Sequence, residues 1–316
     1  CLLNIFSSQP LQVSYYVSKE MKNSVERLLK DDDYDAVYIH LFRMAQYAQH
    51  LKGLRRVLDL CDAVSLHMKR TIIFNRTLLW LVYLIEWLKI EAYERKIMKE
   101  FDEIVLISDS DRQAILDGEL KADNIHVVAN GVDSQYFKPL TENHKVKSIA
   151  FLGYLSTFYN LDAIRYFYQY IFPVIKKSIP DIKFSIIGTH CSPELKRLTQ
   201  DRSIELFCDV EDTRPLLNRA LVFVCPLRVG SGLQNKILEA MSMGLPVVTT
   251  SIGASGLGAA KNKEVFVEDN PYDFAKRVID LIEDEKLRQE ISANARKFIE
   301  NNYRWQDSVY KLEALF

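Results

Sequence analysis

The residues that most restrict how this chain can fold are 220–250, where four kinds of segment follow one another. An apolar run at 220–226 predicts a buried parallel strand, and a second run at 247–250 predicts another. Between them, a Gly-Ser-Gly turn at 230–232 opens an amphipathic helix that a Gly-Leu-Pro sequence at 244–246 ends. This stretch therefore predicts one βαβ unit with glycines at the corner between strand and helix.

Such a corner suits a phosphate, because glycines let the backbone come close and the helix N-terminus offers its amides. Arg228 enters the corner, whereas Lys236 and Glu239 are three residues apart and so share one helix face. Two cations suit a diphosphate, and one carboxylate suits the hydroxyls of a ribose. Residues 228–244 therefore predict a nucleotide-sugar site.

The length of 316 residues is enough for two domains, each with its own core. Hydrophobic residues make up 48% and charged residues 26%, which is typical of a globular protein. The net charge of −1 gives no bulk basic field, so we expect no nucleic-acid partner. The five cysteines form no Cys-x-x-Cys pair and no cluster with histidine, so we expect neither a metal site nor a disulfide. Cys61 and Cys225 lie in apolar runs and are expected to be small core residues in a reducing compartment.

Apolar runs and helical stretches alternate along the chain, which predicts parallel sheets covered by helices. In the first half, strands are expected at 35–40, 55–60, 102–107 and 125–128, with helices at 42–50 and roughly 70–101, the latter broken near Asn75. In the second half, strands are expected at 148–152, 183–187, 204–207, 220–225, 247–250 and 265–267, with helices at 162–177 and from 273 to about 315.

The polar stretch 140–145 is expected to link two domains. We assign 1–140 to a first domain, 146–300 to a second and 301–316 to a C-terminal helix that returns to the first. Gly153 ends a strand, and ligands in open α/β sheets bind beyond the carboxyl ends of strands. The loop after Gly153 and the loop at Arg228 should therefore face the same crevice.

The apolar stretch 78–88 is too short to span a bilayer, where about 20 apolar residues are needed. Two interpretations remain open. The stretch is either a buried helix of the first domain or an interfacial helix with Trp80, Tyr83 and Trp87 at a membrane surface. Basic residues flank it in the sequence, namely Lys69, Arg70, Arg76 and Lys89.

Four segments, in this order, resemble the donor-binding half of the retaining glycosyltransferases of family four, which have the GT-B fold. They are Asn130-Gly131-Val132-Asp133, Phe151-Leu152-Gly153, Ile186-Ile187-Gly188, and 226–248. Tyr303-Arg304-Trp305 resembles the C-terminal helices of that family, so the resemblance runs from about residue 100 to the end. The version Gly-Ser-Gly-Leu-Gln-Asn-Lys at 230–236 resembles a subgroup used in exopolysaccharide and surface-glycan assembly. The resemblance implies an α/β GT-B protein with two Rossmann-like domains that face a cleft.

The resemblance also implies the chemistry of the donor side. A sugar would move from a UDP- or GDP-sugar with retention and without a metal or other cofactor, while Arg228 and Lys236 stabilise the leaving diphosphate. Glu239 would bind the ribose, and the base would lie over the loop after Gly188 and near Leu206 and Phe207. The expected donor-binding residues are Gly153, Gly188, Leu206, Phe207, Gly230, Ser231, Gly232 and Glu239.

The chain departs from the family motif, in which a second glutamate stands eight residues before the one that matches Glu239. Ser231 occupies that position, so Ser231, Gly232 or backbone amides would take its role. His190 and Cys191 follow Gly188, but this pair alone predicts no metal site.

The sequence contains fewer signals for the acceptor-binding half of the protein. Nothing before Tyr34 supplies the glycine-rich loop that normally opens this half, so we expect the first strands of the domain to be missing. Polar residues at the ends of three successive strands are candidates for catalysis or acceptor binding, and a surface or capping role stays open for each: His40, Arg43, Asp59, Asp62 and Ser108. In related enzymes a His or Asp at the second strand end contacts the sugar or acceptor, which favours Asp59 and Asp62, with His40 as an alternative.

Together, these features predict a glycosyltransferase that moves a hexose-type sugar onto a glycan or lipid-linked acceptor in the cytoplasm or at the inner face of the membrane. Two alternatives are kept. A nucleotide-sugar epimerase shares the architecture but needs a set of carboxylate and histidine residues that does not assemble around Arg228. A non-catalytic nucleotide-sugar-binding scaffold or partner subunit would result if the opening strands are natively absent.

Overall fold

A computed structural model describes residues 7–74, 79–116, 123–141 and 146–316. The chain divides into two compact units, the first comprising Cys1–Ala129 with Val309–Phe316 and the second comprising Asn130–Ser308. Each unit contains one parallel sheet with helices packed on it, so the α/β class predicted from the sequence is confirmed. Most of the expected linker, residues 142–145, lies outside the described residues.

The first unit has a four-stranded parallel sheet in the order β1-β2-β3-β4. Its strands are β1 (Ala36–His40), β2 (Arg55–Cys61), β3 (Glu103–Leu106) and β4 (Ile125–Val127). The backbone is irregular where β1 and β2 end. The register of β2 on β3 shifts between Asp59 and Cys61, and Leu41 and Cys61 have φ values of 74° and 61°. Few non-glycine residues adopt positive φ, so the structure around them must hold these two in place.

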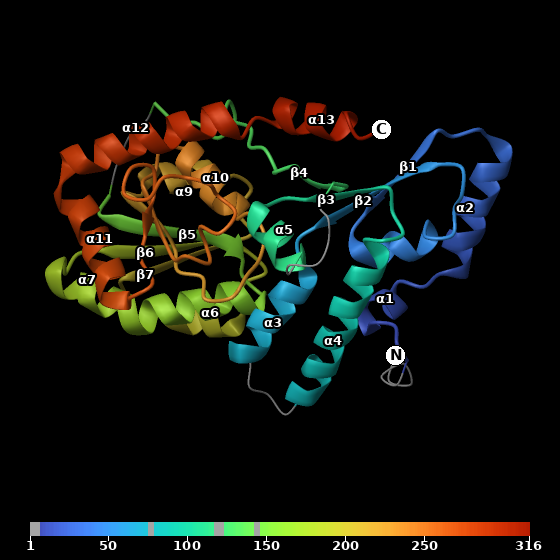
Figure 1. The fold of residues 1–316 in the computed structure, drawn as a ribbon. Coiled ribbons are helices and arrows are strands. Elements are labelled where there is room, and N and C mark those ends of the chain that lie inside the picture. Colours follow the sequence, from blue (N-terminus) through green and yellow to red (C-terminus); the bar gives the residue numbers. More distant parts are fainter. Residues whose placement is uncertain (1–6, 75–78, 117–122, 142–145) are drawn as a thin grey trace. The chain divides into compact units, whose positions relative to one another are not determined.

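Helices cover this sheet and close its core. They are α1 (Leu11–Tyr15), α2 (Lys19–Asp31), α3 (Val64–Phe74), α4 (Trp80–Ile97) and α5 (Asp109–Leu116). Glu94 of α4 accepts from the amide of Val64 at the start of α3, and the two helices pack together (Figure 1). The expected break near Asn75 lies outside the described residues. The helix predicted at 42–50 is instead a shorter 3-10 helix, Phe42–Tyr47, and α1 and α2 were not predicted.

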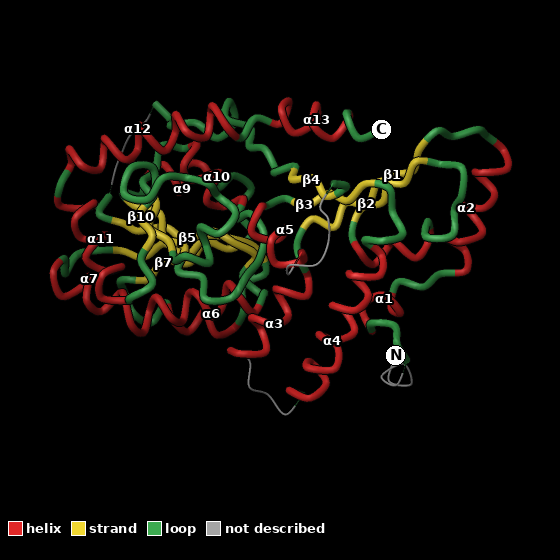
Figure 2. The backbone as a smooth tube through the Cα atoms, in the orientation of Figure 1, coloured by secondary structure: helices red, strands yellow, loops and turns green. Residues whose placement is uncertain are grey.

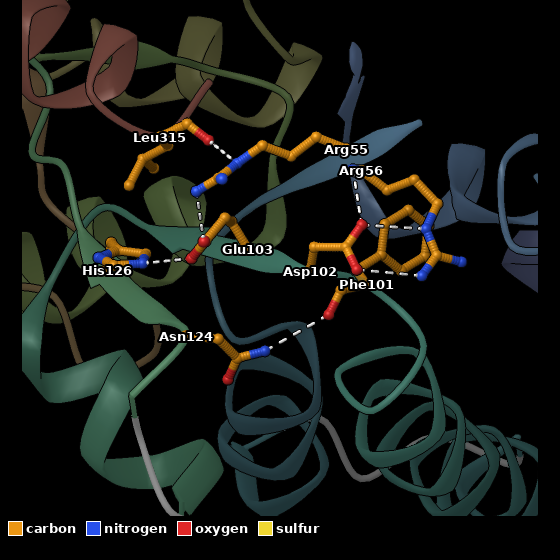
Figure 3. A network of polar contacts seen from close by, with 8 residues as sticks. All are labelled: Arg55, Arg56, Phe101, Asp102, Glu103, Asn124, His126 and Leu315. Atoms are coloured by element: carbon orange, nitrogen blue, oxygen red, sulfur yellow. Dashed lines mark hydrogen bonds and ion pairs between the residues drawn. The ribbon is translucent and has the colours of Figure 1, made fainter. Parts of the chain in front are cut away.

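The last residues of the chain belong to the first unit. Leu315 packs on Val57 and Val105, and its carbonyl accepts from Arg55 Nε at 2.5 Å (Figure 3). Arg55 Nη2 also donates to Glu103 Oε1 at 2.8 Å, and Glu103 Oε2 lies 2.6 Å from His126 Nε2. This network begins at the first residues of β2 and β3, so it fixes the amino-terminal edge of the sheet and leaves the carboxyl edge free for a site.

The second unit has a six-stranded parallel sheet in the order β10-β9-β8-β5-β6-β7. Figure 2 draws its strands in yellow. Its strands are β5 (Ser148–Tyr154), β6 (Lys183–Thr189), β7 (Ile204–Cys208), β8 (Val222–Cys225), β9 (Val247–Thr249) and β10 (Phe266–Val267). Strand β8 is buried along its whole length, as its apolar run predicts for a central strand covered on both faces.

Helices lie on both faces of this sheet (Figure 1). They are α6 (Phe158–Tyr166), α7 (Phe172–Ser178), α8 (Pro193–Leu198), α9 (Arg214–Arg219), α10 (Asn235–Ser242), α11 (Pro271–Glu283), α12 (Glu285–Asn302) and α13 (Trp305–Glu313). The helix predicted at 162–177 begins earlier than expected, and a π-helical turn at Phe167–Ile171 joins α6 to α7. α13 begins in the second unit, and its residues from Val309 on belong to the first.

Two glycines stand opposite each other where β5 and β6 end. Gly153 pairs with Gly188, and a Cβ on Gly188 would lie 1.8 Å from the carbonyl oxygen of Gly153. Gly131 is confined in a similar way, since a Cβ there would lie 2.6 Å from the amide nitrogen of Trp305. The Asn-Gly turn and the Tyr303-Arg304-Trp305 segment, far apart in the sequence, therefore pack against each other.

Cys191 and Cys208 form a disulfide, so the expectation of no disulfide was wrong. The two residues are 17 positions apart, a spacing that carries no motif. They meet because β6 and β7 are neighbouring parallel strands and Gly188 is paired with Cys208. Cys225 is a buried core residue as expected, whereas Cys61 is partly exposed and does not belong to the core.

Candidate functional site

The loop that leads from β8 into α10 forms the centre of the predicted donor site. Gly232 has a φ of 68°, a conformation that favours glycine. Ser231 is buried, and its carbonyl accepts from Gln234 Nε2 at 3.1 Å. Gln234 is the residue before α10, and because its side chain turns back to the loop it does not cap the helix. The first turn of α10 therefore has no side-chain cap, an arrangement suited to an anion.

Lys236 reaches from α10 to the carboxyl end of β5. Its Nζ donates to Asn160 Oδ1, and Asn160 Nδ2 donates to the carbonyl of Tyr154 at 2.9 Å. Asn160 is buried and close to Gly153, since a Cβ on Gly153 would lie 2.8 Å from Asn160 Nδ2. The structure thus brings the predicted Gly153 and Lys236 together through Asn160. No sequence pattern pointed to this role of Asn160.

Arg228 is held by a carboxylate from α6. Its Nε and Nη2 donate to the two oxygens of Asp162 at 3.0 and 2.5 Å, and its guanidinium lies 4.6 Å from the ring centre of Tyr166. This bidentate pair fixes the orientation of Arg228 and offsets its charge. Asp162, two positions after Asn160, is a second residue of the site that the sequence analysis did not predict. A bound anion would share Arg228 with Asp162.

Glu239 lies one helical turn beyond Lys236. Burial raises the pKa of Glu239 to about 7, and the nearby Lys236 ammonium opposes that shift. Desolvation in turn lowers the pKa of Lys236, an effect that Cys225 and Glu239 oppose. Among the described residues, no hydrogen bond satisfies the Glu239 carboxylate. The Glu239 carboxyl group therefore changes its charge near neutral pH, and its oxygens can accept from a polar ligand.

The residues expected to hold the base lie at the ends of β6 and β7. Leu206 and Phe207 are half-buried on β7, an edge strand, and Gly188 is one position before the last residue of β6. Tyr154 and His190 stack with ring centres 4.5 Å apart, and the disulfide of Cys191 and Cys208 follows directly. The exposed aromatic pair is a flat surface that sequence reasoning did not predict.

In the first unit, His40 and Asp59 lie together at the carboxyl edge of the sheet. Asp59 Oδ2 accepts from the Tyr38 hydroxyl at 2.5 Å and lies 3.2 Å from His40 Nδ1. Asp59 Oδ1 accepts from the amide of Cys61 at 2.9 Å, and Cys61 Sγ lies 3.6 Å from His40 Nδ1. Burial, reinforced by Asp59, raises the pKa of both Tyr38 and Cys61. Cys61 is thus part of a polar cluster that the sequence did not indicate.

The other acceptor-side candidates have different surroundings. Burial raises the pKa of Asp62 to about 6, and the carboxylates of Asp111 and Asp59 add to the shift. Ser108 is buried, and its Oγ donates to Asp111 and accepts from the Asp111 amide at 3.1 Å, so Ser108 has the capping role that was left open for it. Arg43 donates twice to Gln12 Oε1, at 3.1 and 2.6 Å, which ties the 3-10 helix to α1.

The face of α4 expected at a membrane is not the exposed one. Trp80 is exposed, but Tyr83 and Trp87 pack on the core of the first unit. The exposed apolar side chains of α4 include Leu81, Ile85 and Leu88, with 63%, 42% and 51% of their surface exposed. Among the described residues, no helix is both long enough and apolar enough to traverse a bilayer.

Comparisons with known proteins agree with this architecture. Residues 146–284 match the family model described as Glycosyl transferases group 1. An uncharacterized protein of the cps region of Klebsiella pneumoniae is 29% identical over 177 residues, which cover 54% of this chain and 45% of that protein. The capsular polysaccharide biosynthesis glycosyltransferase CapM of Staphylococcus aureus is 27% identical over 234 residues, covering 68% of this chain and 61% of CapM. The chain thus spans about half to three fifths of these relatives.

Solved structures define the fold class. The crystal structure of TarM superposes with a TM-score of 0.73 and 17% identity, covering 93% of this chain and 57% of TarM. Anabaena HepE, solved in complex with UDP and glucose, gives a TM-score of 0.71 and 12% identity, covering 93% of this chain and 80% of HepE. The chain has the GT-B fold. Within this fold, residues 146–284 are similar to the Glycosyl transferases group 1 family.

Proposed function

We propose that this chain takes part in a retaining glycosyltransferase that moves a hexose-type sugar from a nucleoside-diphosphate sugar to a glycan or lipid-linked acceptor in surface polysaccharide biosynthesis. The observation that carries the proposal is the convergence of Lys236, Arg228 and Glu239 at the carboxyl edge of the second sheet. This edge is where α/β sheets bind ligands. The relatives named above, one of them a capsular polysaccharide glycosyltransferase, support the class of pathway.

In this proposal, Lys236 is the principal group for the diphosphate. Its ammonium is oriented by Asn160 and desolvated, so a phosphate oxygen would meet a cation with little competing water. Arg228 is fixed by Asp162 and would contribute less, because it is already paired. The uncapped first turn of α10 adds backbone amides at the same corner. These groups would stabilise the leaving diphosphate without a metal ion.

Glu239 would accept from the ribose hydroxyls, and Gly230, Ser231 and Gly232 would contact the sugar. Gly188, Leu206 and Phe207 would line the base, with the ring pair of Tyr154 and His190 beside them. UDP is our first choice of donor nucleotide, because HepE was solved with UDP. On the acceptor side, we place Asp59 and His40 near the acceptor hydroxyl and keep Asp62 as a secondary candidate.

The alternative of a non-catalytic nucleotide-sugar-binding scaffold shares the donor site and differs only in turnover. The epimerase alternative is less favoured, because the carboxylate that meets Arg228 is Asp162, which is engaged in a bidentate pair. An assay of product formation separates all three.

The test is calorimetric titration of the chain with UDP, GDP and ADP without added metal. We expect one of them, UDP, to bind saturably. Each of Lys236→Ala, Arg228→Ala and Glu239→Ala should weaken binding, since charge-assisted contacts contribute about 1.5–3 kcal/mol. Lys147→Ala is the matched control, because Lys147 pairs with Asp181 before the start of β5 at the opposite edge of the sheet. Losses below threefold in all three site variants would overturn the site assignment.

Turnover is tested separately with UDP-glucose and a membrane-lipid extract, and the anomeric configuration of the product is read by NMR. A product with retained configuration supports the enzyme. UDP binding without any transfer would favour the scaffold, and release of an isomerised nucleotide sugar would favour the epimerase.

We also propose that α4 rests on a membrane surface at the inner face of the cytoplasmic membrane. Leu81, Ile85 and Leu88 follow one another at helical spacing and form an exposed apolar stripe. Ile73 and Phe74, the last residues of α3, are also exposed. Lys96, which pairs with Glu100, lies further along α4. An exposed apolar face is typical of helices that lie at a lipid interface.

Cosedimentation with vesicles of phosphatidylcholine and phosphatidylglycerol tests this contact. The double variant Leu81→Glu with Leu88→Glu should lower binding at least about tenfold, given about 1.5–3 kcal/mol for each buried leucine. Leu28→Glu on α2 is the matched control, because Leu28 is similarly exposed. Equal binding of the double variant and the wild type would show that this face does not contact lipid.

A further inference from the structure

His40, Asp59 and Cys61 offer three different ligand atoms at the carboxyl edge of the first sheet. A ring nitrogen, a carboxylate oxygen and a thiol sulfur lie within 4.8 Å of one another. The residues come from the ends of the neighbouring strands β1 and β2, where His40 is paired in register with Asp59. These atoms are the ligand types that proteins use for zinc.

The distances fit a tetrahedral ion. Bonds of about 2.0–2.3 Å at tetrahedral angles separate neighbouring ligand atoms by about 3.3–3.6 Å. His40 Nδ1 lies 3.2 Å from Asp59 Oδ2 and 3.6 Å from Cys61 Sγ. The two distances from His40 are thus in the range of a tetrahedral site, and the remaining pair, Asp59 and Cys61, has its ligand atoms within 4.8 Å of each other.

Surrounding groups hold the three side chains in this arrangement. The amide of Cys61 donates to Asp59 Oδ1, and the Tyr38 hydroxyl donates to Asp59 Oδ2, so the carboxylate is oriented from both sides. Cys61 itself has a φ of 61°, next to the register shift that ends β2. Such outer contacts are the kind that orient ligands around protein-bound metals.

The local charge also favours a cation. Among the described residues, no lysine or arginine pairs with Asp59, whose ion-pair partner is His40. Asp62 adds a second carboxylate nearby, and its Oδ1 is shielded from solvent without a hydrogen-bond partner in the described part of the chain. We propose that His40, Asp59 and Cys61 bind a divalent transition-metal ion, with Zn²⁺ the best fit to this mixed ligand set.

Three protein ligands leave a fourth position of the ion open, and the His40 side chain is 58% exposed, so solvent reaches the cluster. Water or a hydroxyl group of a bound molecule would fill it. This site belongs to the first unit, and the donor-site proposal for the second unit does not depend on it.

The experiment is an anaerobic titration of the chelator-stripped full chain with Co²⁺, a spectroscopic probe for Zn²⁺. Saturation at one Co²⁺ per chain, with a sulfur-to-cobalt charge-transfer band that Zn²⁺ abolishes, is the expected result. Cys61→Ser should remove the charge-transfer band, and His40→Gln and Asp59→Asn should each weaken binding at least about tenfold. Circular dichroism of each variant verifies its folding, and Cys61→Ala replaces Cys61→Ser if the serine variant misfolds.

Two controls identify the sulfur. Cys225→Ser removes the buried free thiol of the second unit, and the pair Cys191→Ser with Cys208→Ser removes the disulfide. Both should bind Co²⁺ like the wild type. The absence of a saturable charge-transfer band in the wild type would overturn the proposal, and so would its persistence in Cys61→Ser or its loss in either control.

Discussion

Replacing Lys236 by methionine separates ligand binding from folding in the proposed donor site. Methionine keeps most of the side-chain volume but removes the ammonium, which donates to Asn160 and lies 4.9 Å from the ring centre of Phe151. If that ammonium binds a phosphate oxygen, the loss is about 1.5–3 kcal/mol. Since 1.4 kcal/mol corresponds to a factor of ten, UDP affinity should fall about 10- to 150-fold.

The effect on stability should be much smaller, because two terms oppose each other. Asn160 Oδ1 loses its donor inside the protein, which costs about 1–3 kcal/mol. At the same time, the variant no longer buries an ammonium whose pKa burial lowers, so a desolvation cost disappears. We therefore expect a melting temperature close to that of the wild type.

Calorimetric titration with UDP measures the affinity, and thermal unfolding followed by circular dichroism measures the stability. Lys147→Met serves as the control, because Lys147 is exposed and pairs with Asp181 away from the site. The reasoning is refuted if Lys236→Met remains folded and binds UDP within threefold of the wild type. It is also refuted if Lys147→Met loses as much affinity as Lys236→Met.

Three further predictions concern stability. The pKa of Glu239 rises from 4.5 to about 7 on folding, so the free energy of unfolding should fall by about 2 kcal/mol as the pH increases between these values. Glu239→Gln should abolish this pH-dependent fall, and urea unfolding at both ends of the range checks its sign. Reduction of the disulfide between Cys191 and Cys208, which spans 17 residues, should lower the free energy of unfolding by about 3 kcal/mol. Thiol labelling of the unreduced, denatured chain should modify Cys61 and Cys225 but neither Cys191 nor Cys208. Gly188→Ala should destabilise by about 3 kcal/mol, because its Cβ would meet the Gly153 carbonyl. Gly230→Ala has the same φ of 158° and carries the backbone strain of that conformation, but its Cβ would meet no atom nearer than 3.8 Å, so it should destabilise less; equal urea midpoints for the two variants would contradict this.

Sequence patterns were most informative where burial on both faces of a sheet demanded continuous apolar runs. The strands at Ser148–Tyr154, Lys183–Thr189 and Val222–Cys225 all fall on runs that predicted them. Periodicity was less informative at 42–50, where the chain forms a 3-10 helix directly after the positive φ of Leu41. No helix was predicted at Lys19–Asp31 either, although α2 is amphipathic and Ser18 caps it by accepting from the amide of Met21.

The predicted donor residues were chosen by their type and by their place after strands, and neither property shows which partners they meet. Lys236 contacts Asn160 across 76 positions, and Arg228 contacts Asp162 across 66. Each pair exists because β5 and β8 are neighbours in a sheet whose order differs from that of the chain. The same reason hid the disulfide and the cluster of His40, Asp59 and Cys61, since both join the ends of adjacent parallel strands.

The sequence by itself thus determined the α/β class, the position of most strands and the corner where a nucleotide sugar is expected to bind. These features are local, because apolar period, glycine conformation and helix termination act over a few residues. Only the tertiary structure decided that Arg228 is neutralised by Asp162, that Lys236 is desolvated beside Asn160 and that Cys61 leaves the core to join His40 and Asp59. Those outcomes depend on which strands lie side by side, and in a parallel sheet the crossover connections can place strands that are distant in the sequence next to one another.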